Sequence, residues 1–234
     1  MAPSPPTGRP SASGSSKKPK KRKRSSGARL FKFDHGLGHR FVAGADEAGR
    51  GCLAGPLVAA GVLFDYETLS LSDRRALSVL NDSKQHTHEM REELYPRIMR
   101  VASRVTVTSR CVRGIDSFGL HKTNLAALSD CLRRVAVPGA LCLSDGFPVP
   151  ATGFDQRAVV GGDRTSAAIA AASVIAKVSR DRFMVRAAER YPHWEFEGHV
   201  GYSTPEHRAA IELHGISPLH RLSFQSVAYS QLAL

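Results

Sequence analysis

Two adjacent acids, Asp46 and Glu47, follow a short apolar run and precede Gly49-Arg50-Gly51. Residues 41–43 predict the end of a strand, and the uninterrupted apolar run of residues 57–64 predicts a second, fully buried strand. The two acids therefore stand where a core strand leaves the interior. Like charges a few ångström apart repel each other and burial removes their hydration, so an uncompensated pair would be electrostatically costly.

A divalent metal ion is the natural compensation for this pair, because carboxylate oxygens are the ligands that Mg²⁺ and Mn²⁺ prefer. Successive side chains of a regular strand point to opposite faces, so Asp46 and Glu47 share a site only if the strand ends or bends there. Ala48-Gly49 permits such a bend. Two alternatives stay open: a glycine-rich turn with solvated acids, and a dinucleotide-binding loop, which the order Gly-x-Asp-x-x-Gly-x-Gly disfavours.

Two further aspartates are candidates for the same site. Asp145 follows an apolar strand pattern and precedes a glycine, which is also the composition of an ordinary turn. Asp163 stands just before the longest helical pattern, where it would equally serve as an N-terminal cap. Asp181 lies about 27 Å further along that helix and cannot share a metal ion with Asp163. We expect it to pair with Arg180 or Arg182.

Strands alternate with helices along the chain, which predicts one α/β domain. The predicted strands cover residues 41–43, 57–64, 104–112, 141–143 and 158–160. The predicted helices cover about residues 87–102, 125–135, 165–190 and 205–214, the last capped by Ser203 or Thr204.

Six blocks in this order resemble the family of type 2 ribonuclease H, also called ribonuclease HII, over about residues 41–227. The first is the acidic segment, residues 44–56. The others are Asn81-Asp82-Ser83-Lys84, Leu143-Ser144-Asp145-Gly146, Gly162-Asp163 with residues 169–177, Gly198-His199-Val200-Gly201-Tyr202, and His220-Arg221-Leu222-Ser223-Phe224. The resemblance implies a bacterial enzyme with a ribonuclease-H-like fold, in which helices flank a mixed central sheet and a small helical part follows at the C-terminus.

The resemblance also implies an activity. The enzyme would hydrolyse the RNA strand of RNA/DNA hybrids and cut 5′ of single ribonucleotides embedded in duplex DNA, leaving 5′-phosphate and 3′-hydroxyl ends. Two divalent ions, Mn²⁺ or Mg²⁺, would be held by the four carboxylates of Asp46, Glu47, Asp145 and Asp163.

By the same resemblance, the ribose would be recognised by Gly49, Arg50, Gly51 and Tyr202. Lys84 would contact a phosphate near the scissile bond, and Arg221 with Ser223 would contact the DNA backbone. Each of these three has an alternative as an ordinary solvated residue, and Tyr202 has one as a core aromatic with its hydroxyl at the surface. We treat the ten histidines as solvated or structural, with His199, near Tyr202, as the exception.

Three positions depart from the family pattern. Gly161 stands where many relatives have lysine, Ser203 where glycine often follows the tyrosine, and Leu222 where a second arginine is frequent. The first and third departures remove positive charge near the substrate, so we expect them to affect affinity more than chemistry.

The chain has a formal net charge of +12, and residues 1–29 hold nine of the 33 Lys and Arg residues and no acid. We expect residues 1–28 to be a disordered basic tail and residues 29–234 to form the catalytic domain with a C-terminal substrate-binding segment. The tail suits a solubility arm, a weak nucleic-acid tether or a nuclear import signal.

No apolar stretch reaches the roughly 18 residues that a membrane span needs, and the N-terminus lacks an apolar signal-peptide core. We therefore expect a cytoplasmic monomer with no membrane partner. The cysteines at positions 52, 111, 131 and 142 have no metal-site spacing and are expected to be reduced.

Two other functions remain open from the sequence. A nucleic-acid-binding protein would have an inert cleft and would bind through its tail. A nuclease or integrase directed at DNA would share the fold but would cut duplexes without ribonucleotides.

Overall fold

The computed structural model describes residues 26–81, 86–150 and 152–224. Its strands are β1 Phe41–Ala48, β2 Leu57–Asp65, β3 Arg104–Arg110, β4 Leu141–Asp145 and β5 Asp155–Val159. They form one five-stranded sheet in the order β3-β2-β1-β4-β5, in which β2 alone runs antiparallel to its neighbours. The sheet is mixed, as the resemblance to type 2 ribonuclease H implies.

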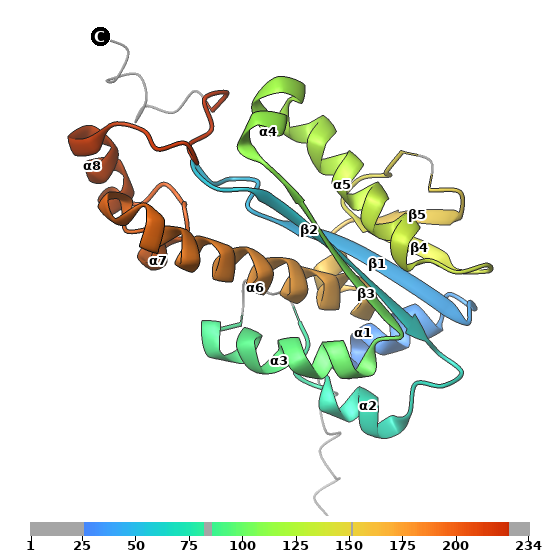
Figure 1. Ribbon diagram of the computed structural model, residues 1–234. Coiled ribbons are helices and arrows are strands. Elements are labelled where there is room, and N and C mark those ends of the chain that lie inside the picture. Colours follow the sequence, from blue (N-terminus) through green and yellow to red (C-terminus); the bar gives the residue numbers. More distant parts are fainter. Residues whose placement is uncertain (1–25, 82–85, 151, 225–234) are drawn as a thin grey trace, which may run out of the picture.

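Helices cover both faces of this sheet (Figure 1). In the described residues they are α1 Ser26–His35, α2 Leu71–Ala76, α3 His88–Val101, α4 Val112–Phe118, α5 Leu120–Val135, α6 Ala167–Arg190, α7 Phe196–His199 and α8 Pro205–His214, with short 3-10 helices η2 Gly162–Arg164 and η3 Pro192–Trp194. One apolar core lies between the sheet and α6, α1 and α3, and a second lies between the sheet and α5. The α/β fold with a mixed sheet flanked by helices is thus confirmed.

The helical periodicities of the sequence are borne out with small changes at the ends. Thr87 caps α3 and Thr204 caps α8, each through its side-chain oxygen. On α3, Leu94 and Ile98 are buried, whereas Met90 is exposed. The helix α1 was not predicted, and the proposed tail boundary at residues 28/29 falls inside it. No helix of the described residues is long and apolar enough to cross a membrane.

The prediction that the first strand ends near Ala43 was wrong. Strand β1 continues to Ala48, because the antiparallel ladder with β2 pairs every residue from Phe41↔Asp65 to Ala48↔Val58. The parallel ladder with β4 stops earlier, at Ala45↔Ser144. Both acids therefore lie within a regular strand, with neighbouring side chains on opposite faces of the sheet.

The first turns of α6 pack unusually close to β1. Gly44 faces them, and a Cβ placed there would lie 2.2 Å from the backbone carbon of Ala168. Alanines occupy most of the early positions of α6 and are fully buried. Small side chains on both elements allow this approach, which brings the start of α6 next to the middle of β1.

We predict that Gly44→Ala lowers the free energy of unfolding by about 3 kcal/mol or more, because the added methyl group overlaps backbone that cannot rotate away. Urea denaturation would measure the change. Gly114→Ala is the matched control, since a Cβ there meets only Cys111 Sγ at 4.0 Å. In α4 that change should be neutral or stabilising by up to about 1 kcal/mol. Equal stability of the two variants would contradict the close packing.

Asp34 of α1 is buried beside the first turn of α6. Its Oδ2 accepts hydrogen bonds from the backbone N–H of Ala168 at 2.9 Å and from the hydroxyl of Tyr66 at 3.1 Å. Burial raises the pKa of Asp34 to about 6, against the opposing effect of these hydrogen bonds and of one with Ser166. The carboxyl therefore holds its proton in the folded protein at pH values where it is ionised in the unfolded chain.

This raised pKa predicts a pH-dependent stability difference between the wild type and Asp34→Asn. As the pH rises from about 4 to above 6, the unfolded chain releases the proton first, so the folded wild type loses up to about 3 kcal/mol relative to the variant. The amide keeps an acceptor oxygen for Ala168 and Tyr66. Denaturation of both proteins across this pH range tests the sign, and a pH-independent difference would contradict it.

Candidate active site

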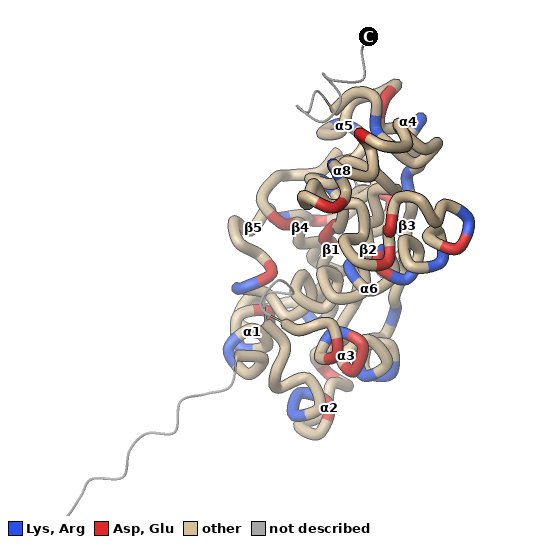
Figure 2. Tube along the Cα trace, turned by 90° about the vertical axis from the view of Figure 1, so that its left-hand side faces the viewer, with Lys and Arg blue, Asp and Glu red and all other residues tan. Residues whose placement is uncertain are grey.

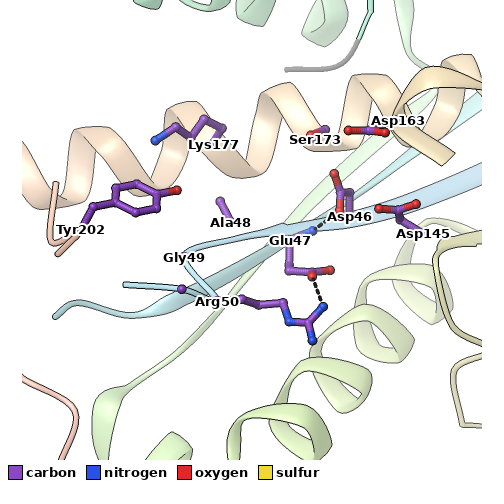
Figure 3. A pocket seen from close by; sticks show the side chains of 11 residues that line it. Asp46, Glu47, Ala48, Gly49, Arg50, Asp145, Asp163, Ser173, Lys177 and Tyr202 are labelled. Carbon is purple, nitrogen blue, oxygen red and sulfur yellow. Dashed lines mark hydrogen bonds and ion pairs between the residues drawn. The ribbon is translucent and has the colours of Figure 1, made fainter. Parts of the chain in front are cut away.

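A pocket of about 370 Å³ opens at the carboxyl ends of β1 and β4, beneath α6. The four predicted acids, the Gly49-Arg50-Gly51 segment and Tyr202 all line it, together with Ala48, Ser173 and Lys177 (Figure 3). In the charge-coloured tube, acidic positions lie beside the central strands β1 and β4 (Figure 2). The structure thus brings residues from four distant parts of the chain to one place.

The acids gather here because the sheet is parallel in this region. Strands β1, β4 and β5 are neighbours that run in the same direction, so their carboxyl ends lie at one edge. Asp46 lies near the end of β1, Asp145 is the last residue of β4, and Asp163 follows β5 in η2. Each of the three aspartates therefore lies at or just after the end of a different parallel strand.

Strand alternation divides the adjacent pair between the two faces. Val42 and Leu143 pack in the core on the α6 face, so Asp46 and Asp145, two or four residues further along the same strands, point to that face as well. Glu47 points the other way, toward α5. Figure 3 shows Asp46, Asp145 and Asp163 converging below α6, with Glu47 directed toward Arg50.

Asp46 is buried, and its Oδ1 accepts a hydrogen bond of 2.8 Å from the backbone N–H of Glu47. Burial holds the pKa of Asp46 well above its ordinary value, and the negative charges of Glu47 and Asp145 raise it further. A hydrogen bond with Ser173 acts in the opposite direction. The ionised form of this carboxylate would therefore gain strongly from a cation in the pocket.

Glu47 has different surroundings. Burial raises the pKa of its carboxyl group, while Arg50 and a hydrogen bond with Asn124 of α5 act to lower it. The Arg50 Nη1 lies 3.3 Å from the Glu47 Oε1. This carboxylate is already partly compensated by protein groups, whereas Asp46 is surrounded by other acids.

Asp145 and Asp163 are linked through the turn before η2. The backbone N–H of Gly162 donates a hydrogen bond of 2.6 Å to the Asp145 Oδ1. A Cβ on Gly162 would lie 3.1 Å from that oxygen and 2.5 Å from Ile169 Cδ1, so a larger residue here would displace the Ile169 side chain. Asp163 itself is buried at the pocket wall. The helix cap of α6 is supplied by Ser166, whose side chain accepts from Ile169 N, and Asp163 is thus left to face the pocket.

The segment from Gly49 to Pro56 is held by two buried arginines that donate to backbone carbonyls. Arg180 of α6 donates to Ala54 O and Pro56 O, and also to Val200 O, at 2.8–3.0 Å. Arg221 donates twice to Gly55 O and once to Arg50 O, at 2.9–3.1 Å. Neither arginine was assigned this role from the sequence.

Arg221 has a role in this structure that the sequence did not predict. Its side chain is fully buried and binds backbone carbonyls, and its predicted contact with a DNA backbone stays a prediction. Gly49 adopts φ +94° directly against Arg180, and a Cβ there would lie 2.1 Å from the Arg180 Nε. Both guanidinium groups therefore stabilise the backbone conformation of the Gly49-Arg50-Gly51 turn.

Tyr202 lies across the pocket from the acids and is 40% exposed. The Lys177 Nζ lies 5.0 Å from the centre of its ring. Lys177 and Ser173 are one turn apart on α6 and both line the pocket. Their spacing in an otherwise alanine-rich helix was the available signal, but no role was predicted for either residue.

Two further residues singled out in the sequence, Ser223 and Asp181, do not line this pocket. Ser223 is exposed, and its hydroxyl and backbone N–H both donate to the Asp116 Oδ1. Asp181 forms an ion pair of 2.8 Å with Lys177, and not with either neighbouring arginine as predicted, because Arg180 binds carbonyls and Arg182 pairs with Glu92. Lys84 lies outside the described residues.

The carboxylates share a pocket, yet they do not form a ready-made metal centre. Within the described ranges, no group of three or more His, Cys, Asp or Glu side chains is arranged to hold a metal ion.

Comparison with known proteins identifies relatives of this chain. The model of the family described as ribonuclease HII matches residues 43–227. A ribonuclease HII of Rhizobium johnstonii is 47% identical over 190 residues, which cover 80% of this chain and 79% of the relative. The solved PCNA:RNase HII complex of Archaeoglobus fulgidus matches with a TM-score of 0.66 and 26% identity, over 80% of this chain and 96% of that chain.

A second solved structure, Bst-RNase HIII in complex with Mn²⁺, matches with a TM-score of 0.58 over 92% of this chain and 75% of that one. At 19% identity it supports the fold alone. The mixed sheet and the acidic pocket at its carboxyl edge define a hydrolase with a ribonuclease-H-like fold. The chain belongs to the ribonuclease HII family, and it is accordingly a ribonuclease H, an endonuclease that acts on RNA/DNA hybrids.

The buried position of Arg221 leads to a prediction about stability. Arg221→Lys should lower the free energy of unfolding by about 2–4 kcal/mol, because one ammonium group cannot replace the planar fork that serves two carbonyl groups. Thermal and urea denaturation would measure the loss. Leu222→Arg, at the exposed neighbouring position, is the control and should change stability by less than about 0.5 kcal/mol.

A different pattern would support the predicted contact of Arg221 with DNA. If Arg221→Lys kept wild-type stability but bound duplex DNA more weakly, the side chain would have to reach the DNA in solution.

Proposed function

We propose that this ribonuclease H also incises duplex DNA on the 5′ side of a single embedded ribonucleotide, through two divalent metal ions, leaving 5′-phosphate and 3′-hydroxyl ends. The observation that carries the proposal is the shared pocket. The acids lie on one wall, and the Gly49-Arg50-Gly51 turn and Tyr202 lie on the other. One nucleotide could therefore present its phosphate to the acids and its sugar to the turn.

The donor set fits hard divalent ions such as Mg²⁺ or Mn²⁺. Carboxylate oxygens suit both ions, and the burial of Asp46 among like charges gives a cation the largest electrostatic benefit there. Asp46, Asp145 and Asp163 would hold the ions from the α6 side, and Glu47 would join them by leaving Arg50. Two bound ions would supply an activated water and a stabilised leaving oxygen.

The protein's own groups would position the substrate. Recognition of a ribonucleotide requires a contact with the 2′-hydroxyl, the group that separates RNA from DNA. A Cβ on Gly51 would meet no atom within 4 Å, so the backbone is open to a sugar at this point. The half-exposed ring of Tyr202 offers a flat surface on which a sugar can pack. These contacts depend on the sugar and not on the base, which suits a substrate of any sequence.

Positive charge near the pocket would attract the phosphates. Arg50 is 41% exposed at its rim, and Lys177 lies between Tyr202 and the acids. Ser223 remains a candidate contact for the DNA backbone, since it is exposed on the last described segment. Neither Gly161 nor Leu222 supplies a charge here, so Arg50 and Lys177 would carry most of the phosphate binding from the described residues.

We predict that Asp46→Asn and Asp145→Asn each lower cleavage of a duplex containing one ribonucleotide by at least about 10³-fold, because a lost metal ligand removes several kcal/mol of transition-state stabilisation. Single-turnover assays in Mg²⁺ and in Mn²⁺ would measure the rates. The variants should be as stable as the wild type or more so, because each replaces a charge that its neighbours repel.

Three substrates separate the possible outcomes. The one-ribonucleotide duplex and an RNA/DNA hybrid should be cut, and an all-DNA duplex should stay intact. Mapping of the products should show a 5′-phosphate on the fragment that begins with the ribonucleotide. Cleavage of the hybrid alone would overturn the finer proposal and leave the ribonuclease H class unchanged. Near-normal turnover by Asp46→Asn would refute the role of the acids.

A further inference from the structure

Three histidines are buried directly behind Tyr202. His199 ends α7, His207 lies in α8, and His220 lies in the segment that follows α8. Their exposed fractions are 8%, 0% and 2%. The rings of His199 and His207 stack with centroids 4.2 Å apart, and Phe196 packs against all three rings. This cluster lies outside the acidic pocket and has no role in the chemistry proposed above.

The hydrogen bonds of this cluster determine which nitrogen of each ring carries the proton. A backbone N–H can only donate, and a neutral imidazole has one donor and one acceptor nitrogen. Ser217 N donates to the His220 Nδ1 at 2.8 Å, so the proton of His220 is on Nε2. That nitrogen lies 3.1 Å from the His207 Nε2, which must accept. The proton of His207 is therefore on Nδ1, which donates to Tyr202 O at 2.8 Å.

The same reasoning fixes His199. Gly201 N donates to the His199 Nδ1 at 3.1 Å, so the Nε2 carries the proton and donates to Trp194 O at 2.8 Å. Between these residues, Val200 adopts φ +42°, a conformation that is unfavourable for a β-branched side chain. The cluster therefore surrounds a strained turn that leads directly into Tyr202.

His220 also connects to the Gly49-Arg50-Gly51 turn. Its backbone forms an isolated bridge with Ala54. The next residue, Arg221, donates from its backbone N–H to Leu53 O at 2.9 Å and from its guanidinium group to Arg50 O. The segment that orients His220 is thus the segment that holds the turn, and the chain of hydrogen bonds ends at the backbone of Tyr202.

We infer that His207 and His220 are positioning residues for ribose recognition. They form a neutral pair with fixed tautomers that holds the backbone of Tyr202 in a fixed position relative to the Gly49-Arg50-Gly51 turn. This inference rests on the proposed substrate contacts of Tyr202 and the turn. Protonation of either ring would turn its acceptor nitrogen into a donor and break the chain. Burial lowers the pKa of both rings to about 4, so both are neutral at pH 7.

The tautomers are tested on the wild-type full-length protein by ¹⁵N NMR of the histidine side chains at pH 7.5. His207 should be protonated on Nδ1 and His220 on Nε2, the opposite tautomers. A charged imidazolium at either position, or the same tautomer at both, would overturn the chain of hydrogen bonds. This measurement requires no substrate and is independent of the proposed function.

The positioning role is tested with two variants of similar size. In His207→Asn the amide N–H takes the place of the Nδ1 donor to Tyr202 O, whereas in His207→Gln the amide lies near the Nε2 position and that donor is lost. We expect His207→Gln to lower kcat/KM for the one-ribonucleotide duplex roughly tenfold or more, as for a small displacement of a substrate contact, and His207→Asn to stay within about threefold of the wild type. Equal losses would contradict positioning through this hydrogen bond.

A Tyr202→Ala background separates positioning from general stability. If His207 acts through Tyr202, His207→Gln should cause no further loss of kcat/KM in that background, whereas a merely structural defect would add its full effect. Full wild-type cleavage by Tyr202→Ala would overturn the proposed substrate contact, and with it the positioning role, while the NMR result on the tautomers would stand.

Discussion

The close approach of α6 to β1 is the constraint on which the rest of the site depends. Gly44 leaves no side chain between the strand and the backbone of Ala168, and the alanines at the start of α6 let the helix settle onto the sheet. That contact fixes the distance between α6 and Asp46. It places Ser173 within reach of Asp46, and the turn that precedes the helix carries Asp163 to the same wall. A larger residue at either surface would separate the acids.

The buried acids of the pocket lower the stability of the fold. Buried carboxylates repel one another and lose hydration, an effect that costs stability unless a cation is bound. The protein offsets this cost in two ways. Asp46 and Asp145 accept backbone hydrogen bonds from Glu47 and Gly162, and apolar cores on both faces of the sheet hold the strands in place. Strain of this kind is expected where function and stability compete.

Much of the fold could be predicted because its signals are local. The apolar period of α5 and the run of β2 depend on neighbouring residues, and the position of Asp145 at a strand exit is visible in the sequence. The roles of Arg180 and Arg221 could not be predicted, because a buried arginine that donates to distant carbonyls has no periodic signature. The end of β1 was misjudged for a related reason: its ladder with β2 continues past the point where its apolar pattern stops.

The helix α6 joins two tasks that the sequence alone does not connect. Its first half borders the acids through Ser173. Its second half holds two backbone segments through Arg180, which donates to Ala54 O and Pro56 O after β1 and to Val200 O before Tyr202. A rigid helix keeps the distance between these two regions constant. The distance from the acids to the proposed sugar-binding surface is then set by the spacing of residues along one helix. In the proposed function, this fixed distance places the cut relative to a ribose without a contact to any base.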